Sequence, residues 1–523
     1  MTRYSPATRR HLLKMMAAAA PLGVAAPFAL QMATLGSAAA QTVPTSYKAL
    51  VCIFLFGGND SHNMVLATDS DSWGRYFAAR NTGNDPIALM PPGTAPAAVG
   101  SVSPVTARTV TRSTPEFLGG VLPITPRTPN PVPAGTNASS RSFALHPALS
   151  PLVQGAASPW SAGRLAILAN VGPLIVPTTK AQYSTRSVSL PPNLMSHNDQ
   201  VSIWQSGAAE GAKRGWGGLM ADSMLAQNGS SAVFTAVSAN GNAVFLAGNT
   251  AVQYQINTSA QPAILPNAAS GSTLYGSQTA ARTLAESIRD VSGTSLFAQD
   301  HAGMTRRAMD SAQALNTAFA SGPAASISAP SNYTNPVTGA VEANSLATQL
   351  MTVARSVAAA TALGVTRQVF FVGLGGFDTH DNQNTTHTNL MGKLAHAMAY
   401  FDGVLGNIGG LNMRGSVTTF TMSDFGRTFT SNGDGTDHAW GGHQLIMGGA
   451  VRGRDVFGQF PTVGVDRAGF SNPDMSGNIL IPTTSVYQVG STLGKWFGLA
   501  DAQLLTIFPN LGSFSRRDLG FMV

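Results

Sequence analysis

Residues 50–62 read Leu50-Val51-Cys52-Ile53-Phe54-Leu55-Phe56-Gly57-Gly58-Asn59-Asp60-Ser61-His62, and this stretch decides the fold class of the chain. Its first seven residues are apolar, and two glycines followed by polar residues end the run. A short run that is apolar on both faces is typical of a strand in a buried parallel sheet. Similar runs occur at residues 165–169, 232–237, 369–374 and 417–422.

Helical patterns lie between these runs. The clearest have apolar residues at a spacing of three or four positions over residues 346–360 and 390–405. Alternation of strand and helix is the signature of a layered fold. The sequence therefore predicts an α/β protein with a mostly parallel central sheet and helices on both faces.

Two segments depart from this alternation of strand and helix. Residues 82–142 are dense in Pro, Thr, Ser, Ala and Gly and have almost no periodic apolar face, which predicts an irregular insertion at the surface. Residues 257–344 are low in apolar content but have helical patterns over residues 277–291 and 304–320. We expect these helices to form a small helical cap on the main domain, residues 41–523.

The N-terminus resembles an export signal. Thr8-Arg9-Arg10-His11-Leu12-Leu13-Lys14 resembles the twin-arginine consensus, and an alanine-rich stretch follows and ends at Ala40. The alternative is an uncleaved membrane anchor, but Pro21, Pro27 and the weak hydrophobicity of alanine count against it. The sequence predicts a twin-arginine signal peptide over residues 1–40, the twin-arginine translocation machinery as a partner, and a periplasmic or secreted protein. Residues 41–523 contain no apolar run of transmembrane length.

Net charge, cysteine content and the absence of certain motifs exclude several classes of protein. The formal net charge is +7, and four of these charges lie in residues 1–40, so the rest of the chain is near +3 and nothing in it calls for nucleic acid. Cys52 is the only cysteine, which rules out an intrachain disulfide. The chain has no nucleotide-binding GxGxxG or GxxxxGK motif and no GxSxG hydrolase elbow.

Polar residues follow three of the predicted strands, and another polar cluster comes soon after the last of them. The carboxyl ends of parallel strands meet at one edge of a sheet, where active sites of open α/β folds are built. Carboxylates and imidazoles gathered there can bind a divalent metal. The candidate metal ligands are Asp60, Asp378, His380, Asp424, His438 and His443. Each also has a structural explanation: an aspartate can cap a helix or close a turn, and a histidine can be a satisfied core residue.

Two further residues are candidates for catalysis. Ser196 precedes a helical pattern, so it would lie near a helix N-terminus, where backbone N–H groups favour an anionic substrate. A neighbouring metal could make its hydroxyl a nucleophile; the alternative is an ordinary helix N-cap. Arg427 could clamp an anionic oxygen, or it could form a surface ion pair.

The motifs together resemble a bacterial family catalogued as domain of unknown function 1501, whose members typically carry a twin-arginine signal. The resemblance covers most of residues 41–523. It rests on Leu55-Phe56-Gly57-Gly58-Asn59-Asp60, Leu145-His146-Pro147-Ala148-Leu149, Gly163-Arg164-Leu165-Ala166, Ser196-His197, Ile203-Trp204-Gln205, Gly376-Phe377-Asp378-Thr379-His380, Asp424-Phe425-Gly426-Arg427-Thr428, Thr436-Asp437-His438 and Trp496-Phe497-Gly498.

That family is similar in fold to the alkaline phosphatase and sulfatase superfamily, whose members use one or two divalent metals and a Ser, Thr or modified Cys nucleophile. The resemblance implies that Asp60 binds metal and that Ser196 stands in the nucleophile's place. It implies one metal pair of Asp378 with His380, and another of Asp424 with His438 or His443. The sequence departs from the superfamily pattern at Asp424-Phe425, where Asp-His is common, and in the short spacing from Asp378 to His380.

Two functional hypotheses follow. The first is a periplasmic, metal-dependent hydrolase of a small phosphate or sulfate ester, with one or two ions of Zn, Mn, Ca or Mg. The rival is a non-catalytic envelope or binding protein that retains the fold. Geometry separates them, because the first requires the Asp and His side chains to converge on one point that Ser196 faces.

Overall fold

A computed structural model describes residues 47–132, 140–256, 258, 276–289, 295–320 and 322–523. A nine-stranded sheet forms its centre, in the order β13-β5-β12-β11-β1-β10-β6-β7, with β16 paired to β5. The three central strands are β11 (Val417–Ser423), β1 (Lys48–Phe56) and β10 (Arg367–Gly375), and they run parallel. The predicted α/β fold with a mostly parallel sheet is therefore confirmed.

The outer strands make the sheet mixed. β12 (Gly442–Met447) runs antiparallel to both of its neighbours, β11 and β5 (Leu165–Gly172). The other pairings in the sheet are parallel. The remaining strands of the sheet are β6 (Ala236–Ser238), β7 (Tyr254–Gln255), β13 (Val456–Phe457) and β16 (Thr484–Ser485).

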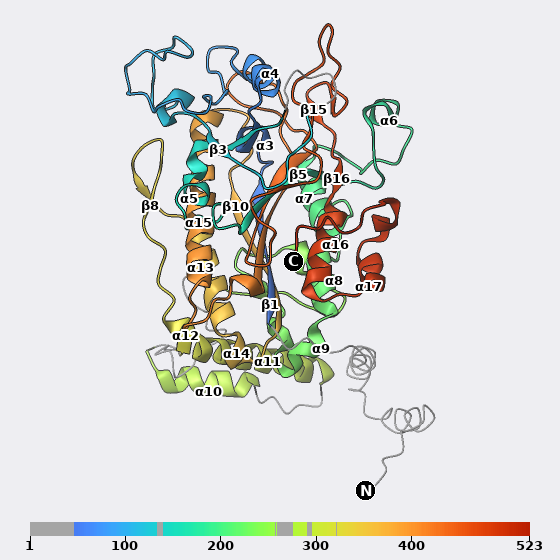
Figure 1. The fold of residues 1–523 in the computed structure, drawn as a ribbon. Coiled ribbons are helices and arrows are strands. Elements are labelled where there is room, and N and C mark those ends of the chain that lie inside the picture. The colour runs from blue at the N-terminus through green and yellow to red at the C-terminus, as the bar shows by residue number, and fades with distance from the viewer. Residues whose placement is uncertain (1–46, 133–139, 257, 259–275, 290–294, 321) are drawn as a thin grey trace.

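The side chains of β1 alternate between two cores. Val51, Ile53 and Leu55 pack into one core, whereas Leu50, Cys52 and Phe54 pack into the other, as the two-residue period of a strand requires. The first core is covered by α13 (Ser345–Ala358) and α15 (Gln383–Leu405), and the second by α8 (Trp216–Asp222) and α16 (Val486–Phe497) (Figure 1). Helices therefore cover both faces of the sheet, as predicted.

Cys52 lies at the middle of this arrangement. Its side chain is fully buried in the second core, and burial raises the pKa of its thiol well above the ordinary value. The thiol therefore behaves as a small apolar group.

One of the five predicted strands is only partly correct. Within residues 232–237, the chain forms a 3-10 helix, η4 (Gly229–Phe234), and the strand β6 begins only at Ala236. Val233 is 40 % exposed, so the apolar run does not lie in a buried sheet along its whole length. Apolar character alone does not distinguish a strand from a short helical turn.

The described part of the predicted insertion, residues 82–132 and 140–142, is mostly irregular. It contains η2 (Pro115–Leu118) and a short strand, β3 (Leu122–Ile124). This strand joins β4 (Phe143–Leu145), which also pairs with β2 (Val65–Ala67), in a small three-stranded sheet.

The predicted helical cap contains α10 (Gln278–Arg289), α11 (Leu296–Phe319) and α12 (Gly322–Ala325), followed by a hairpin of β8 (Tyr333–Thr334) and β9 (Val341–Glu342). These three helices lie at the amino-terminal end of the central strands, beside α14 (Ala360–Leu363) (Figure 1). They are therefore at the opposite end of the sheet from the Asp and His loops and do not cover them.

The remaining elements are short. They are α3 (Ser61–Met64), α4 (Ser70–Arg80), η3 (Pro147–Leu149), α5 (Ser150–Val153), α6 (Lys180–Thr185), α7 (His197–Ser206), α9 (Leu225–Asn228), η5 (Val244–Leu246), η7 (Arg414–Ser416), β14 (Met475–Ser476), β15 (Ile479–Leu480), α17 (Asp501–Ile507) and η8 (Pro509–Ser513). The predicted signal peptide, residues 1–40, lies outside the described residues. Among the helices that the structure describes, none combines the length and the apolar character that crossing a membrane requires.

Candidate functional site

Loops at the carboxyl ends of the three central strands meet at one place. β11, β1 and β10 are neighbours in the sheet, and the loops that follow them carry Asp424, Gly57 and Asp378. The first turn of α7 and the loop before β12 add His197 and His438. The convergence that the sequence predicts at this edge of the sheet is therefore found for Asp378, His380, Asp424 and His438.

Three of these side chains form a compact group, which we call the His–Asp–His cluster: His197, Asp378 and His438. One potential ligand atom of each residue lies within 4.8 Å of those of the others. Nε2 of His197 is 3.3 Å from one carboxylate oxygen of Asp378, and Nε2 of His438 is 3.1 Å from the other. Among the described residues, this is the group of three with metal-binding geometry.

Each histidine of the cluster is held from behind by an oxygen acceptor. Nδ1 of His197 lies 2.7 Å from Oδ2 of Asp424, and Nδ1 of His438 lies 2.9 Å from the backbone oxygen of Met195. Carboxylate and carbonyl oxygens only accept hydrogen bonds, so Nδ1 of each ring must be the donor. A neutral ring therefore presents the lone pair of Nε2 to the centre of the cluster.

In this arrangement, the Nε2 lone pairs of the two histidines face the carboxylate of Asp378. Nε2 of both rings faces the oxygens of Asp378, which are themselves acceptors. Acceptors that face one another repel unless a proton or a cation lies between them. Nε2 of His197 and Oδ1 of Asp424 are also buried atoms that have no hydrogen-bond partner among the described residues. Unsatisfied atoms of this kind call for an explanation.

The electrostatics of the two rings differ. The hydrogen bond to Asp424 raises the pKa of His197 above its ordinary value. Burial lowers the pKa of His438. Burial by itself would raise the pKa of Asp378, but its hydrogen bond to Arg427 lowers it below the ordinary range, so the carboxylate is ionised. A neutral His438 thus lies beside a negative charge.

His380 adds a third imidazole beside the cluster. Its Nε2 is 2.9 Å from Nε2 of His438 and 3.1 Å from Oδ1 of Asp378. Its Nδ1 is 3.2 Å from the carboxylate of Asp437. The ring thus has the same orientation as the other two, with an acceptor behind it and Nε2 directed at Asp378.

Arg427 lies behind Asp378. Its side chain is fully buried, and Nη1 donates to Oδ1 of Asp378 at 2.7 Å. Nη2 donates to the backbone oxygen of Thr436, and Nη1 also reaches the oxygen of Gly57 at 3.3 Å. The guanidinium is therefore committed to the protein. It positions and partly neutralises Asp378, and it is not placed as the predicted clamp on a substrate oxygen or as a surface ion pair.

Asp60 is not a metal ligand in this arrangement. Its carboxylate is fully buried and forms an ion pair with Arg80 at 2.5 Å. It also accepts from Gln383 at 2.6 Å and from the backbone N–H of His62 at 3.1 Å, which caps α3. Burial by itself would raise the pKa of Asp60, but Arg80 lowers it well below the ordinary range. Its lone pairs are committed to these donors, so the helix-cap alternative describes it better.

A chain of buried hydrogen bonds links Asp60 to the cluster. Gln383 donates to Asp60 and accepts from the hydroxyl of Thr436 at 2.7 Å. That hydroxyl accepts from Nε of Arg427 at 3.3 Å, and Arg427 binds Asp378. Asp60 therefore acts on the cluster only at a distance, through residues that fix the position of Asp378.

His443 is also separate from the cluster. Its ring is buried and stacks on Phe460, with ring centroids 4.5 Å apart. Nδ1 accepts from the backbone N–H of Asn170 at 3.1 Å, and burial lowers its pKa well below the ordinary value. Of the two late histidines, the structure brings His438 to the site and places His443 in the core.

Ser196 is next to the site in sequence, but its hydroxyl is directed elsewhere. It is the N-cap residue of α7 and makes no side-chain capping bond. Its Oγ donates to Asp199 at 2.9 Å. The prediction of a serine near a helix N-terminus is correct, whereas a hydroxyl that faces the carboxylates is not observed.

Backbone geometry supports the site at two positions. Met195 has a φ of +73°, which is uncommon for a residue with a side chain; its carbonyl oxygen is the one that holds His438. Gly57 has a φ of +113°, and a Cβ there would lie 2.3 Å from the backbone nitrogen of Asp378. The N–H of Gly57 donates to Asp424 at 3.0 Å. A strained residue, Met195, and a glycine that adopts positive φ without strain thus occur where the backbone orients the polar groups.

The sequence interpretation missed His197 as a site residue. The signal that could have found it is its place after Ser196, in the first turn of a predicted helix whose start was already singled out. The carbonyl of Met195 and the buried Arg80 gave no comparable signal, because their roles depend on contacts that are remote in sequence.

Comparison with known families places these observations in context. Residues 47–508 match the model of a family described as protein of unknown function (DUF1501). The match spans every residue of the His–Asp–His cluster. No curated protein matches the chain. Because the family model covers well over half of the sequence, the chain belongs to the DUF1501 family.

Proposed function

We propose that the protein is a metal-dependent hydrolase of phosphate or sulfate esters, and that the His–Asp–His cluster is its metal site. The observation that carries this proposal is the orientation of the two imidazoles. Each has its Nδ1 on an oxygen acceptor and its Nε2 directed at a shared carboxylate. Histidines that bind metals are oriented in this way by acceptors behind the ring.

The donor set favours some metals over others. His197 and His438 would supply nitrogen, and Asp378 would supply oxygen. Two imidazoles and a carboxylate suit Zn, Mn or Fe, whereas Ca and Mg prefer oxygen ligands. The one group of three that the described residues form supports a single ion. His380 lies close enough to Asp378 and His438 to serve as a further ligand. A divalent ion bound there would act as a Lewis acid on an ester oxygen.

The chain's own residues would prepare the site for that chemistry. Asp424 and Met195 fix the two rings, and Arg427 holds one oxygen of Asp378. Ser196 stays the candidate nucleophile because it directly precedes His197. For attack on an ester, its hydroxyl would have to rotate away from Asp199, lose its proton to another base and displace the alcohol of the ester.

Two broader features belong to the same proposal. A sheet with polar loops at its carboxyl edge agrees with an alkaline-phosphatase-like fold, although this kind of edge is common to many α/β enzymes. The twin-arginine motif of residues 8–14 would direct the protein to the periplasm. Export of a folded chain would allow the metal to be loaded before translocation.

The first test is the metal content of the purified protein, measured by mass spectrometry. We expect about one equivalent of Zn, Mn or Fe in the wild type and little in His197→Ala and His438→Ala. His301→Ala is the matched control, because His301 is exposed on α11 and remote from the site. Wild-type protein that folds but takes up none of these metals contradicts the proposal.

The second test is hydrolysis of p-nitrophenyl phosphate, bis-p-nitrophenyl phosphate and p-nitrophenyl sulfate by the metal-loaded protein. The rival function is a non-catalytic binding protein, and the bond from Ser196 to Asp199 favours it. Bound metal without turnover of any ester would support that rival. Turnover that is lost in Asp378→Ala and kept in His301→Ala would support the hydrolase.

A further inference from the structure

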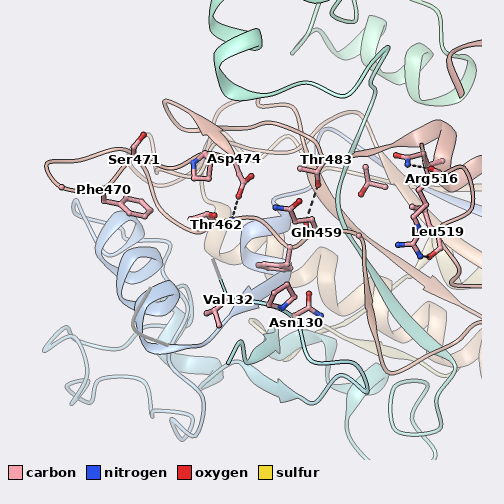
Figure 2. Close-up of a pocket in the computed structure, with 17 residues that line it drawn as sticks. Asn130, Val132, Gln459, Thr462, Phe470, Ser471, Asp474, Thr483, Arg516 and Leu519 are labelled. Atoms are coloured by element: carbon pink, nitrogen blue, oxygen red, sulfur yellow. Dashed lines mark hydrogen bonds between the residues drawn. The ribbon is translucent and has the colours of Figure 1, made fainter. Parts of the chain in front are cut away.

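A groove of about 800 Å³ lies apart from the His–Asp–His cluster (Figure 2). Its walls come from residues 458–474, from the start of α16, from Asn130 to Val132 and from the C-terminal segment around Arg516. None of the residues that line it belongs to the cluster. Its size falls within the range of small-molecule binding sites.

The groove carries little charge. Among the residues that line it, the charged ones are Asp474 and Arg516, and Figure 2 shows Asp474 and Gln459 lying between Phe470 on one side and Arg516 on the other. Arg516 uses Nε and Nη2 to bind the backbone oxygens of Asp518 and Leu519. The N-terminus of α16 is closed by its own capping box, so it offers no anion site. A phosphate or sulfate group would find one guanidinium here, two of whose nitrogens are already bonded to backbone oxygens, and one carboxylate that repels it.

Several polar groups of the lining have unused hydrogen-bonding capacity. The side chains of Gln459 and Ser471 are exposed, and neither has a hydrogen-bond partner among the described residues. Asp474 accepts the backbone N–H of Thr462 with one oxygen, at 2.7 Å, which leaves its other oxygen open. Amides and hydroxyls both donate and accept, whereas a carboxylate only accepts. A matching ligand therefore carries groups that can do both.

Apolar surface lies beside these groups. Phe470 is half-buried; the guanidinium of Arg75 lies over its ring at 4.1 Å, and that of Arg467 lies 5.8 Å from the ring centroid. These contacts keep the ring in place at one end of the groove. Val132 and Leu519 also contribute apolar atoms to the lining. Amides, hydroxyls and a carboxylate beside an aromatic ring are complementary to a sugar, which has hydroxyls at its edge and C–H groups on its faces.

We propose that this groove binds a neutral, hydroxyl-rich ligand of the size of a short oligosaccharide. Gln459 and Asp474 would bind its hydroxyls, and Phe470 would pack against a ring face. The inference is independent of the metal site, because the groove and the cluster share no residue. It adds a binding site to the protein whether or not the cluster is catalytic.

The test is isothermal titration of the full-length folded protein with three neutral probes: maltotriose, cellotriose and chitotriose. We expect at least one to bind, and we expect Gln459→Ala and Phe470→Ala each to weaken that binding about tenfold or more. Gln255→Ala is the matched control, because Gln255 is an exposed residue on β7, at the edge of the sheet opposite β13. This variant should bind like the wild type.

Three results would overturn the proposal. The first is no binding of any probe to folded wild-type protein. The second is binding that Gln459→Ala and Phe470→Ala leave unchanged, which would place the sugar elsewhere. The third is binding that Gln255→Ala weakens as much as they do. Because Gln459 is exposed, its substitution by alanine should leave the fold intact, which circular dichroism checks.

Discussion

At the scale of single residues, Gly57 decides how close the first strand's loop can come to Asp378. Its backbone has a φ of +113°, its N–H binds Asp424 and its carbonyl accepts from Arg427. A side chain at this position would meet the backbone of Asp378 at 2.3 Å. The absence of a side chain at Gly57 therefore permits its close approach to the backbone of Asp378. This approach places its N–H on Asp424 and its carbonyl on Arg427, which binds Asp378.

Gly57→Ala should be strongly destabilising, and Gly211→Ala provides its matched control. Gly211 has a φ of +91°, and no atom lies within 4 Å of the position that a Cβ would take, so alanine there meets backbone strain without a collision. We expect Gly211→Ala to lower the free energy of unfolding by about 1–2 kcal/mol. Gly57→Ala should lower it by about 1–3 kcal/mol more. Urea unfolding measures both, and equal losses would contradict the assigned role of Gly57.

Arg80 is a second residue whose loss should be costly. It is fully buried and neutralises Asp60. Removing one partner of a buried ion pair leaves an uncompensated charge, so Arg80→Leu should cost about 3–5 kcal/mol. Arg452→Leu, at an exposed arginine, should have little effect.

The double variant Asp60→Asn with Arg80→Leu completes this test. It removes both charges and should recover part of the loss, since no buried charge then stays unpaired. Chemical denaturation of the four proteins gives the coupling energy. A double variant as unstable as the sum of the two single variants would show that the pair is not coupled.

At this scale, the sequence was a better guide to which residues lie close together than to the role of each residue. Asp378, His380 and Asp424 follow strand ends, so their convergence follows from topology alone, whereas His438 lies in the loop before the antiparallel strand β12. Asp60 occupies the same kind of position, but its partner Arg80 lies twenty residues on, at the end of α4. His443 is in β12 and points into a core. Which face a side chain takes depends on packing that the local sequence does not encode.

At the scale of elements, the first residue of α15 connects two loops to the site. Gln383 binds Asp60 with one end of its amide and Thr436 with the other. Thr436 is fully buried and contacts Arg427 through both its hydroxyl and its carbonyl oxygen. The start of this helix therefore fixes the loop before β12 relative to the loop after β1.

Thr436→Val and Thr436→Ser separate the hydroxyl from the shape of this residue. The test rests on the proposed metal site. Valine keeps the volume and the backbone bond to Arg427 but removes the two hydrogen bonds of the hydroxyl, so zinc affinity should fall roughly tenfold, as for other residues that support metal ligands. Serine keeps the hydroxyl and should bind zinc nearly as tightly as the wild type. Competition with a zinc-sensitive dye measures both.

The outcomes of that experiment are distinct. If wild-type protein binds no zinc, the proposed metal site is wrong. If wild type and Thr436→Val bind zinc equally, the metal site stands and the positioning role of Thr436 is wrong.

Elements were predictable where burial is complete. Residues 50–56, 369–374 and 417–422 are apolar on both faces because β1, β10 and β11 are covered by helices on both sides. The antiparallel direction of β12 could not be predicted from the sequence, because the apolar pattern of a buried strand is the same for either direction. Residues 232–237 were predicted less well, because β6 is only three residues long and a 3-10 helix precedes it.

At the scale of the whole molecule, buried histidines make stability depend on pH. Burial lowers the pKa of His62 to about 3 and that of His387 to about 4. In the unfolded chain these rings titrate near pH 6.5. Their contribution to stability is therefore complete above about pH 6.5 and is lost as the pH falls towards the folded pKa values, because the unfolded state then binds more protons.

Urea unfolding at pH 7.5, 6 and 5 should show a free energy of unfolding that falls steadily with acidification. His387 is fully buried and bonds Asn59 through Nε2, so it should contribute to this slope. His301→Ala, at an exposed histidine, should leave the slope unchanged. A free energy of unfolding that is constant from pH 7.5 to 5 would contradict this account.

The position of Cys52 has a practical consequence for measuring how this molecule opens. It is the only thiol in the chain, and it lies in the central strand beneath the second core. A thiol-reactive dye can reach it only when the sheet separates from its helices. The rate of labelling therefore reports the opening of the native protein directly, without denaturant and without an introduced probe.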